Sequence, residues 1–516
     1  MLDSSAFSIH NNFTETSMLR KLLPLASLLF ALPAVALAVP SQTAIDTAQY
    51  ALTTYRAQVV DSLAHMVSFN TVEDPKQAFE TNPQFVGFKD FMKQEAGRLG
   101  FEYEDFGYVL RISYGQGDER VGVITHGDVQ PVDPSKWAKS PFELDRTSEP
   151  GRLLARGSED DKGPIATALY AMKAIKDQGI PLRKRIELYV YLAEESDWEH
   201  LEAFLKTHTP PQMNITLDSE YPAVTAEKGW GLIALTIPRL ALPSAGKAAV
   251  TEFGGGFFAS QIPEDAHAVL SHVDARLEQR IRARAAAQKG MHYSFTRDGA
   301  DLKIVAHGLS AHSSKPEAGI NAISMLADAL AVTRWPENTA GALVNLLNDL
   351  LGTGYKGEKF GKIAYSDSFM GPMTVAPTVI QNQDGAAQLV INVRRPQGKD
   401  GAQLKGEVES ALAGWQKSHV KLADVKIDLH EPWLQKDAPQ LDTLLSVFFH
   451  FTGSKQVAPA AIGGSTNSRL FPHAVSFGPT MPGKVYTGHS EHEFITLDQL
   501  LLNLQMYTAV LVELAR

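Results

Sequence analysis

Acidic and imidazole side chains follow three apolar runs in this sequence, at the point where each run ends. In chain order these residues are His126, the pair Glu194 and Glu195, and Asp218. If the runs are strands of an open α/β sheet, their carboxyl ends meet at one edge, which is where such folds bind ligands. One such residue is typical of a helix cap or a turn. Several in the same topological position favour a site where histidine and carboxylates converge.

Two more segments carry the same residue types. Asp160 and Asp161 stand directly before a predicted helix, and His489 lies in the segment Gly-His-Ser-Glu-His-Glu that ends at Glu493. The alternative role of the adjacent acids is to cap that helix or to pair with its dipole. The chain has no cysteine, which excludes disulfides and a thiolate nucleophile. Any metal must therefore be held by His, Asp and Glu.

The sequence that must position these groups alternates apolar runs with helical patterns. The predicted strands cover residues 121–125, 186–192 and 215–217, and the predicted helices cover residues 45–69 and 164–178. Pro164 suits a first helical position and Gly179 suits a helix stop. This alternation predicts the α/β class, with a mostly parallel sheet covered by helices.

From about Trp230 the pattern changes to alternating strands around helices, which predicts an inserted α+β domain. Its predicted strands cover residues 232–237, 301–305 and 389–393, and its helical patterns cover residues 266–287 and 321–332. Near Pro432 the first pattern returns, with helices at 441–451 and 497–514 and a strand at 474–477. The prediction is a catalytic domain of residues 39–229 and 431–516, interrupted by a lid domain of residues 230–430.

Length and charge limit the possible functions. A chain of 516 residues is expected to form at least two domains, with room for a large cleft between them. Its hydrophobic fraction of 44% and charged fraction of 21% are those of a globular protein. The net charge of −10 comes without a long basic run, so we expect no nucleic-acid partner and favour small-molecule chemistry.

The first 38 residues have the order of a secretory signal peptide. Arg20 and Lys21 precede an apolar run over residues 22–37, which ends in Ala36-Leu37-Ala38. We expect cleavage after Ala38, a periplasmic or secreted mature protein, and no stable membrane anchor after processing. A lone anchor helix is the alternative, although the run is short and interrupted by proline.

The motifs, taken in order, resemble the aminoacylase and carboxypeptidase G superfamily of dizinc amidohydrolases, and most closely its peptidase V and carnosinase-like dipeptidases. The matching segments include His126-Gly-Asp128, Asp160-Asp161-Lys-Gly-Pro164, Glu194-Glu195, Leu217-Asp218, Glu227-Lys-Gly229, Ala311-His312, Asn392-Val-Arg394, Gly463-Gly464 and Phe477-Gly-Pro479. They extend over nearly the whole mature chain. One departure is Ser260, which stands where these relatives usually place Asn.

The resemblance implies two zinc ions. His126 and Asp218 would bind one ion, Glu195 and His489 the other, and Asp160 would bridge them, with a cis peptide between Asp160 and Asp161. His489 is preferred to His492 because the family's ligand stands four residues before a Glu, here Glu493. Two histidines and three carboxylates suit Zn²⁺, with Mn²⁺ or Co²⁺ as substitutes.

The same resemblance assigns roles around the metals. Glu194 would be the general base that activates a metal-bridging hydroxide, and Asp128 would accept a hydrogen bond from the imidazole of His126. From the lid, His312 would stabilise the oxyanion and Arg394 would hold the substrate carboxylate. The loop at Gly463 and Gly464 would add backbone donors.

The predicted function is therefore an exported metal-dependent dipeptidase that cleaves the amide bond of a small peptide. An N-acyl amino acid amidohydrolase or a carboxypeptidase of the same superfamily is the first alternative, since it would share the zinc chemistry. An exported solute-binding protein is the alternative from another class, and it would need a cleft but no metal pair. We expect a monomer, with a dimer as the alternative.

Overall fold

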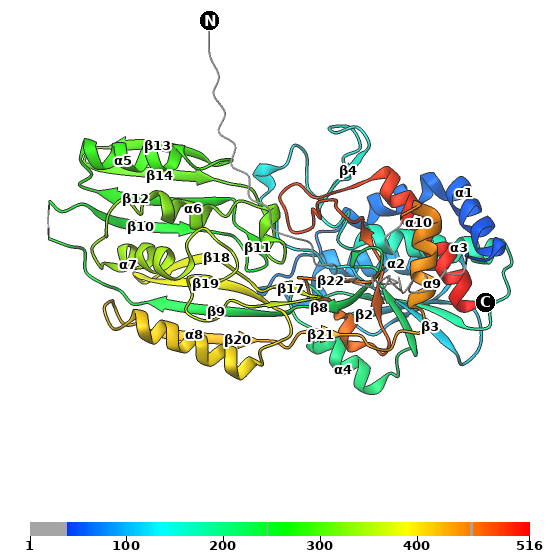
Figure 1. Cartoon of the computed structure of the whole chain (residues 1–516). Coiled ribbons are helices and arrows are strands. Elements are labelled where there is room, and N and C mark those ends of the chain that lie inside the picture. The colour runs from blue at the N-terminus through cyan, green and yellow to red at the C-terminus, as the bar shows by residue number, and fades with distance from the viewer. Residues whose placement is uncertain (1–38, 245, 455–457) are drawn as a thin grey trace, which may run out of the picture. The chain divides into compact units, whose positions relative to one another are not determined.

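The computed structural model describes residues 39–516 except residues 245 and 455–457. The predicted signal peptide lies outside the described residues. Figure 1 shows two groups of elements, each built on its own large sheet. Among the described helices, none combines the length and apolar character needed to cross a membrane.

The first sheet is mixed, with parallel strands at its centre. Its order is β1 (Glu102–Asp105), β2 (Val109–Tyr114), β5 (Arg185–Tyr191), β3 (Arg120–His126), β6 (Met213–Thr216), β23 (Val475–Ser476), β8 (Val224–Glu227) and β21 (Trp433–Leu434), with β22 (Ala460–Ile462) beside β8. The neighbours β5, β3, β6 and β23 run parallel, and antiparallel strands flank them. The carboxyl ends of β3, β5 and β6 consequently lie along one edge.

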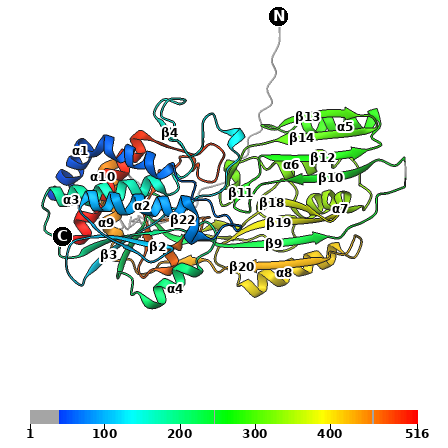
Figure 2. The same ribbon diagram turned by 180° about the vertical axis from the view of Figure 1, so that it is seen from behind.

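Helices cover both faces of this sheet. On one face α1 (Gln42–Val67), α3 (Lys162–Asp177) and α10 (Leu497–Ala515) pack against one another, as Figures 1 and 2 both show. On the other face, α4 (Glu199–Thr207) packs through Leu201 and Phe204 against Tyr189 and Tyr191 of β5. Alternate residues of β5 therefore serve the two layers, as the period of a strand requires. The helices α2 (Pro83–Leu99) and α9 (Leu441–Thr452) complete the cover.

The second sheet is antiparallel and carries the lid. Its order is β13 (His292–Asp298), β14 (Asp301–His307), β12 (Asp265–Ser271), β10 (Ala249–Gly255), β18 (Thr374–Gln383), β19 (Ala386–Arg395), β9 (Gly229–Ile237) and β20 (Asp424–Leu429). Four helices share a single apolar core with it: α5 (Ala275–Ala286), α6 (Ala322–Ala329), α7 (Thr339–Leu346) and α8 (Gly401–Trp415). The predicted class, a helix-covered α/β sheet with an α+β lid, is confirmed.

One predicted helix of the lid is wrong over its first part. Residues 266–287 were expected to be helical, but the structure has strand β12 as far as Ser271 and helix α5 only from Ala275. The reason is that Ala266, Ala268 and Leu270 are buried at every second position, which is the period of a strand. The side chain of Asp274 then caps the helix by accepting from Leu277 N.

Short strands and the sheet boundaries complete the fold. The two-stranded pairs are β4 (Arg152–Leu154) with β25 (Phe494–Thr496), β7 (Ser219–Glu220) with β24 (Pro479–Thr480), β11 (Gln261–Ile262) with β15 (Ala311–His312), and β16 (Ser366–Asp367) with β17 (Gly371–Pro372). The second sheet begins at Gly229 and its last strand ends at Leu429. The division into domains at residues 230 and 430 stays a prediction.

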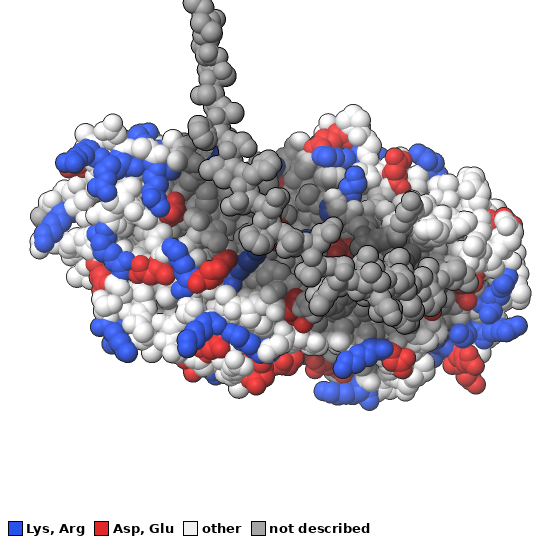
Figure 3. Space-filling view, viewed as in Figure 1, with Lys and Arg blue, Asp and Glu red and all other residues white. Residues whose placement is uncertain are grey.

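Surface charge is mixed on the face drawn in Figure 3. Basic side chains gather there over the α5 end of the lid. In and beside helix α5, Arg282 and Arg297 pair with Glu278, and Arg284 pairs with Asp328. The ion pairs of these arginines are therefore formed with other residues of the lid.

Candidate functional site

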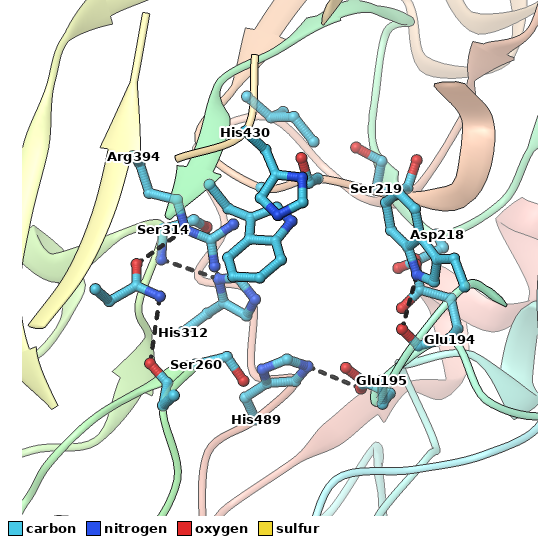
Figure 4. A pocket seen from close by; sticks show the side chains of 18 of the residues that line it. Glu194, Glu195, Asp218, Ser219, Ser260, His312, Ser314, Arg394, His430 and His489 are labelled. Atoms are coloured by element: carbon cyan, nitrogen blue, oxygen red, sulfur yellow. Dashed lines mark hydrogen bonds and ion pairs between the residues drawn. The ribbon is translucent and has the colours of Figure 1, made fainter. Parts of the chain in front are cut away.

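The residues singled out by the sequence meet at one end of a large cavity. His126 is the last residue of β3, Glu194 and Glu195 follow β5, and Asp218 follows β6. The cavity has a volume of about 890 Å³, and both sheets contribute to its lining. Figure 4 shows Glu194, Glu195 and Asp218 on one side of it and residues of the lid on the other. This is the place predicted for a ligand site in an open α/β sheet.

Asp160 stands between two histidines and offers one oxygen to each. Its Oδ1 lies 2.9 Å from His126 Nε2, and its Oδ2 lies 3.2 Å from His489 Nε2. Each histidine also meets a second carboxylate: Asp218 Oδ2 is 3.8 Å from His126 Nε2, and Glu195 Oε1 is 2.8 Å from His489 Nε2. The five residues thus form two His and carboxylate pairs that share Asp160.

Ligand atoms converge closely enough to hold cations. The ligand atoms of His126, Glu194 and Asp218 all lie within 4.8 Å of one another, and so do those of His126, Asp160 and Glu195. None of these carboxylates pairs with Lys or Arg among the described residues. With no lysine or arginine of the described chain paired to them, the four carboxylates gathered around His126 and His489 carry excess negative charge, so a divalent cation fits this donor set.

The electrostatics of the histidines agree with that fit. Burial lowers the pKa of His489, but the carboxylates of Glu195 and Asp160 raise it, for a net rise to about 10. His489 Nδ1 is buried without a hydrogen-bond partner among the described residues. The surroundings of His489 therefore favour a positive charge.

The backbone around Asp160 is held by a buried ion pair. Arg156 Nη1 lies 2.8 Å from Glu493 Oε2, while Glu493 Oε1 accepts from the backbone N–H groups of Glu159 and Asp160 at 2.9 and 3.1 Å. The peptide bond between Asp160 and Asp161 is cis, as predicted. Glu493 thereby links the closing motif of the chain to the backbone of Asp160.

Asp128 holds the segment that carries the two glutamates. Its Oδ1 accepts from Glu194 N at 3.0 Å, and its Oδ2 accepts from Glu195 N at 2.9 Å. His126 Nδ1 lies 3.1 Å from the backbone oxygen of Asp128 and 3.6 Å from its Oδ1. The contact predicted between Asp128 and the imidazole of His126 is thus made more closely by the backbone oxygen of Asp128 than by its carboxylate. The carboxylate instead holds the loop that carries Glu194 and Glu195.

Glu194 is placed differently from Glu195. Its Oε1 is buried with no hydrogen-bond partner among the described residues, and burial raises the pKa of Glu194 well above its usual range. Trp198 Nε1 donates to the backbone oxygen of Glu194 at 3.0 Å, which fixes the loop. A carboxyl group that has a free oxygen and readily holds a proton suits proton transfer. Its oxygen also approaches His126 and Asp218, so distance alone does not separate a base from a ligand.

The two histidines of the closing segment have different surroundings. His489 faces Glu195 and Asp160, whereas the exposed His492 pairs with Glu149 at 2.8 Å. The lid also reaches His489 here, because Gln261 Nε2 donates to its backbone oxygen at 2.9 Å.

His312 reaches the His489 end of the cavity from the lid. Its ring lies 4.3 Å from that of His489, centre to centre. Ser314 N donates to His312 Nδ1 at 3.1 Å, so the proton of a neutral ring sits on Nε2. Burial and the charges of His489 and Arg394 lower the pKa of His312 well below its usual range. His312 is therefore a neutral hydrogen-bond donor at neutral pH.

Arg394 lies further along the same wall and is 6% exposed. Its Nε donates to Asn392 Oδ1 and its Nη2 donates to Ser313 Oγ, both at 3.0 Å. Burial lowers the pKa of Arg394 to about 10, so the guanidinium stays charged at neutral pH. It forms no ion pair with a carboxylate among the described residues, which leaves it able to bind an anionic group of a ligand.

The glycine loop closes the cavity beside this arginine. A Cβ at Gly463 would lie 2.5 Å from the backbone oxygen of Ser314, so only glycine permits the close approach of the loop to the lid. Gly464 and Ser260 line the cavity.

Two residues of the site were missed in the sequence. Tyr486 lines the cavity beside Asp160, and its only signal was its place three residues before His489. Glu227 is fully buried beneath the glycine loop, where its Oε1 accepts from Thr466 Oγ1 at 2.7 Å. Glu227 belonged to a recognised motif, but nothing in the motif indicated what it binds.

Known proteins resemble this chain over most of its length. The model of "Peptidase family M20/M25/M40" matches residues 122–513. The Beta-Ala-Xaa dipeptidase of Lactobacillus delbrueckii subsp. lactis is 30% identical over 468 residues, which cover 89% of this chain and 96% of the relative. The putative dipeptidase YtjP of Bacillus subtilis (strain 168) is 30% identical over 414 residues, covering 80% and 86%.

Solved structures share the fold at low sequence identity. Human carnosine dipeptidase 1 matches with a TM-score of 0.55 at 14% identity, covering 92% of this chain and 99% of that one. The di-peptidase Dug1p of Saccharomyces cerevisiae matches with a TM-score of 0.54 at 13% identity, covering 91% and 98%. Family match, sequence identity and coverage lead to one conclusion: the chain belongs to the peptidase family M20/M25/M40 and is a metal-dependent peptide hydrolase.

Proposed function

We propose that this protein is a dipeptidase that works with two divalent metal ions, zinc being preferred and Mn²⁺ or Co²⁺ acting as substitutes. One observation carries the proposal: Asp160 stands between two His and carboxylate pairs at one end of a cavity that holds a buried Arg394 on its lid side. His126 and Asp218 would hold one ion, His489 and Glu195 the other, and Asp160 both. Bound there, the metals would supply Lewis acidity that polarises the scissile carbonyl and acidifies a water molecule.

The chain's own residues would then move the proton. Glu194 takes a proton from the attacking water and delivers it to the leaving amine, a role that its free Oε1 in the cavity supports. Asp128 keeps this carboxylate in place through the backbone N–H groups of Glu194 and Glu195. His312 donates from Nε2 to the oxygen on which negative charge develops.

The opposite end of the cavity would bind the C-terminal part of the substrate. Arg394 binds the C-terminal carboxylate in two-point geometry, with Gly463 and Gly464 closing the space beside it. Figure 4 shows Arg394 and His430 across the cavity from Glu194 and Asp218, so the peptide bond would lie between them. The buried guanidinium of Arg394 at this end of the cavity suits a substrate with a free C-terminal carboxylate.

The relatives support the same substrate class. The Lactobacillus delbrueckii relative bears the name Beta-Ala-Xaa dipeptidase, and the Bacillus subtilis relative is named a putative dipeptidase. An N-acyl amino acid amidohydrolase or a carboxypeptidase stays the alternative within the family. The solute-binding alternative is set aside because the chain belongs to a peptidase family.

A substrate panel tests the proposal directly. The protein loaded with zinc would be assayed on dipeptides, their C-terminal amides, tripeptides and N-acyl amino acids. We expect free dipeptides to have the highest kcat/KM. Equal rates on the amides, or a preference for N-acyl amino acids, would show that the acylase alternative is correct.

Export and subunit state complete the proposal. The Arg20-Lys21 pair, the apolar run and Ala36-Leu37-Ala38 favour cleavage that leaves Val39 as the first residue of a periplasmic or secreted protein. N-terminal sequencing of the protein recovered from that compartment tests this, and an intact chain in the cytoplasm contradicts it. A monomer is proposed because His312 and Arg394 of the same chain already reach the cavity, and analytical ultracentrifugation would reveal a dimer.

A further inference from the structure

We propose that Tyr486 is a catalytic residue whose hydroxyl donates a second hydrogen bond, beside that of His312, to the substrate oxygen that becomes negatively charged during hydrolysis. The inference rests on the proposed function, because it concerns the same cavity and the same reaction. It adds a donor from the catalytic domain to one from the lid.

The position of the ring carries the first part of the argument. Tyr486 lines the cavity, and its ring stands edge-on to that of His312 with the centres 5.8 Å apart. The ring of His312 in turn lies 4.3 Å from that of His489. The ring of His312 therefore lies between those of Tyr486 and His489, beside the proposed metal position. A carbonyl oxygen that approaches His312 from the cavity therefore also approaches Tyr486.

The hydroxyl end of Tyr486 is located by its neighbours. A Cβ placed on Gly488 would lie 2.3 Å from the Tyr486 hydroxyl oxygen and 2.8 Å from Asp160 Oδ2. The phenol therefore folds back over Gly488 toward Asp160. No other residue type at position 488 leaves room for this hydroxyl. Because Gly488 directly precedes His489, the close approach is built into the ligand-bearing turn itself.

The chemistry of the phenol decides its role. A protonated tyrosine hydroxyl carries one O–H group that it can donate in a hydrogen bond. In the proposed metal-bound site both oxygens of Asp160 face cations, so this carboxylate becomes a poor acceptor. The acceptor that gains charge in the same space is the substrate oxygen. Donors aimed at such developing charge are among the largest contributions to hydrolytic rates.

The step balances without a proton leaving Tyr486. As the water oxygen bonds to the carbonyl carbon, the π electrons move to the carbonyl oxygen, and the hydrogen bonds from Tyr486 and His312 strengthen. When the electrons return, the C–N bond breaks and Glu194 delivers its proton to the amine. Tyr486 begins and ends the cycle protonated.

The test is Tyr486→Phe, which removes one oxygen and keeps the ring against His312. We expect kcat on a free dipeptide to fall about 10²-fold, with KM changed less than about threefold and the metal content unchanged. Affinity for a phosphinic pseudodipeptide, which imitates the tetrahedral oxygen, should weaken by a similar factor. The matched control is Tyr103→Phe in strand β1, where the Tyr103 hydroxyl donates to the backbone oxygen of Lys89 in helix α2, and it should behave as wild type.

Three results would overturn the inference. One is a kcat within threefold of wild type, and another is a loss confined to KM with phosphinate affinity unchanged. The third is loss of metal from Tyr486→Phe, which would assign the hydroxyl to positioning Asp160. Since the wild-type substrate panel is measured separately, failure of this inference is distinguishable from failure of the dipeptidase proposal.

Discussion

The cavity has two ends that are built by different means: a proposed metal end around Asp160 and Glu194, and a lid end around Arg394. At the metal end, side chains extend from adjacent strand ends and are held by backbone groups, as when Asp128 binds the N–H groups of Glu194 and Glu195. At the lid end, Arg394 is held by the side chains of Asn392 and Ser313. It reaches the cavity only because the sheet of the lid packs beside the sheet of the catalytic domain. The edge of one sheet therefore sets the positions of the proposed metal ligands, whereas the packing of two sheets sets the position of Arg394.

This difference separates the expected effects of substitution. Changes at the metal end should remove the chemistry for every substrate, because the shared carboxylate and the proposed base serve the reaction itself. Changes at the lid end should depend on which substrate is offered, because Arg394 and its neighbours contact groups that only some substrates carry. The comparison would be contradicted if substitutions at the two ends of the cavity had the same effect on every substrate.

The largest effect is expected for Asp160→Ala. The variant loses the one carboxylate that faces both His126 and His489, so both metals should be lost and activity should fall to background. Metal analysis by mass spectrometry checks this, with His492→Ala as the control because His492 pairs with Glu149 at the surface. His489→Ala should retain one ion. Full occupancy by two metals in Asp160→Ala would refute the shared role.

Glu194→Gln is expected to have the next largest effect. The amide keeps the shape of the side chain but cannot accept a proton, so kcat should fall about 10² to 10⁴-fold while the metal content stays the same. Stopped-time product assays on a saturating dipeptide measure this. The control Glu202→Gln removes an exposed carboxylate at the cavity wall and should change kcat little. A rate within a few-fold of wild type in Glu194→Gln would place the base elsewhere.

Arg394→Ala should affect substrates selectively. A charge-assisted hydrogen-bonded contact contributes about 1.5 to 3 kcal/mol, so kcat/KM for free dipeptides should fall about 10 to 10²-fold. The C-terminal amides lack the carboxylate and should change much less, which makes them the internal control. Arg394→Lys keeps the charge but loses the planar two-point fork, so it should recover only part of the loss. Equal losses on acids and amides would contradict carboxylate binding.

The same difference explains what the sequence could predict. His126, Glu194 and Asp218 could be brought together from spacing alone, because apolar runs of parallel strands end at a common edge. His312 and Arg394 could not, since β15 and β19 belong to another sheet and only the family resemblance pointed to them. The helix expected at residues 266–287 begins only at Ala275, because Ala266, Ala268 and Leu270 are buried with the period of a strand. Tyr486 was missed because a lone tyrosine in a loop belongs to no recognisable motif.

The smallest effect concerns Glu227, a buried carboxylate at the lid end. Burial raises the pKa of Glu227 to about 7, although Thr466, Arg469 and Arg394 oppose the rise. Between the carboxyl group's ordinary pKa of about 4.5 and pH 7, the folded protein holds a proton that the unfolded chain releases. Its stabilising contribution is therefore complete below about pH 4.5 and is lost as pH rises through 7.

Glu227→Gln removes this titration and keeps the size of the side chain. The free energy of unfolding of wild type, relative to the variant, should fall by about 3 kcal/mol between pH 4.5 and pH 8, since each pKa unit is worth about 1.36 kcal/mol. Urea unfolding of both proteins at the two pH values measures the difference, and changes in metal binding common to both cancel. Glu202→Gln is the exposed control and should show no such pH dependence. If the free energies of unfolding of wild type and Glu227→Gln change in parallel with pH, Glu227 is already ionised at pH 4.5. Glu227 would then carry a charge, as the carboxylates at the proposed metal end do.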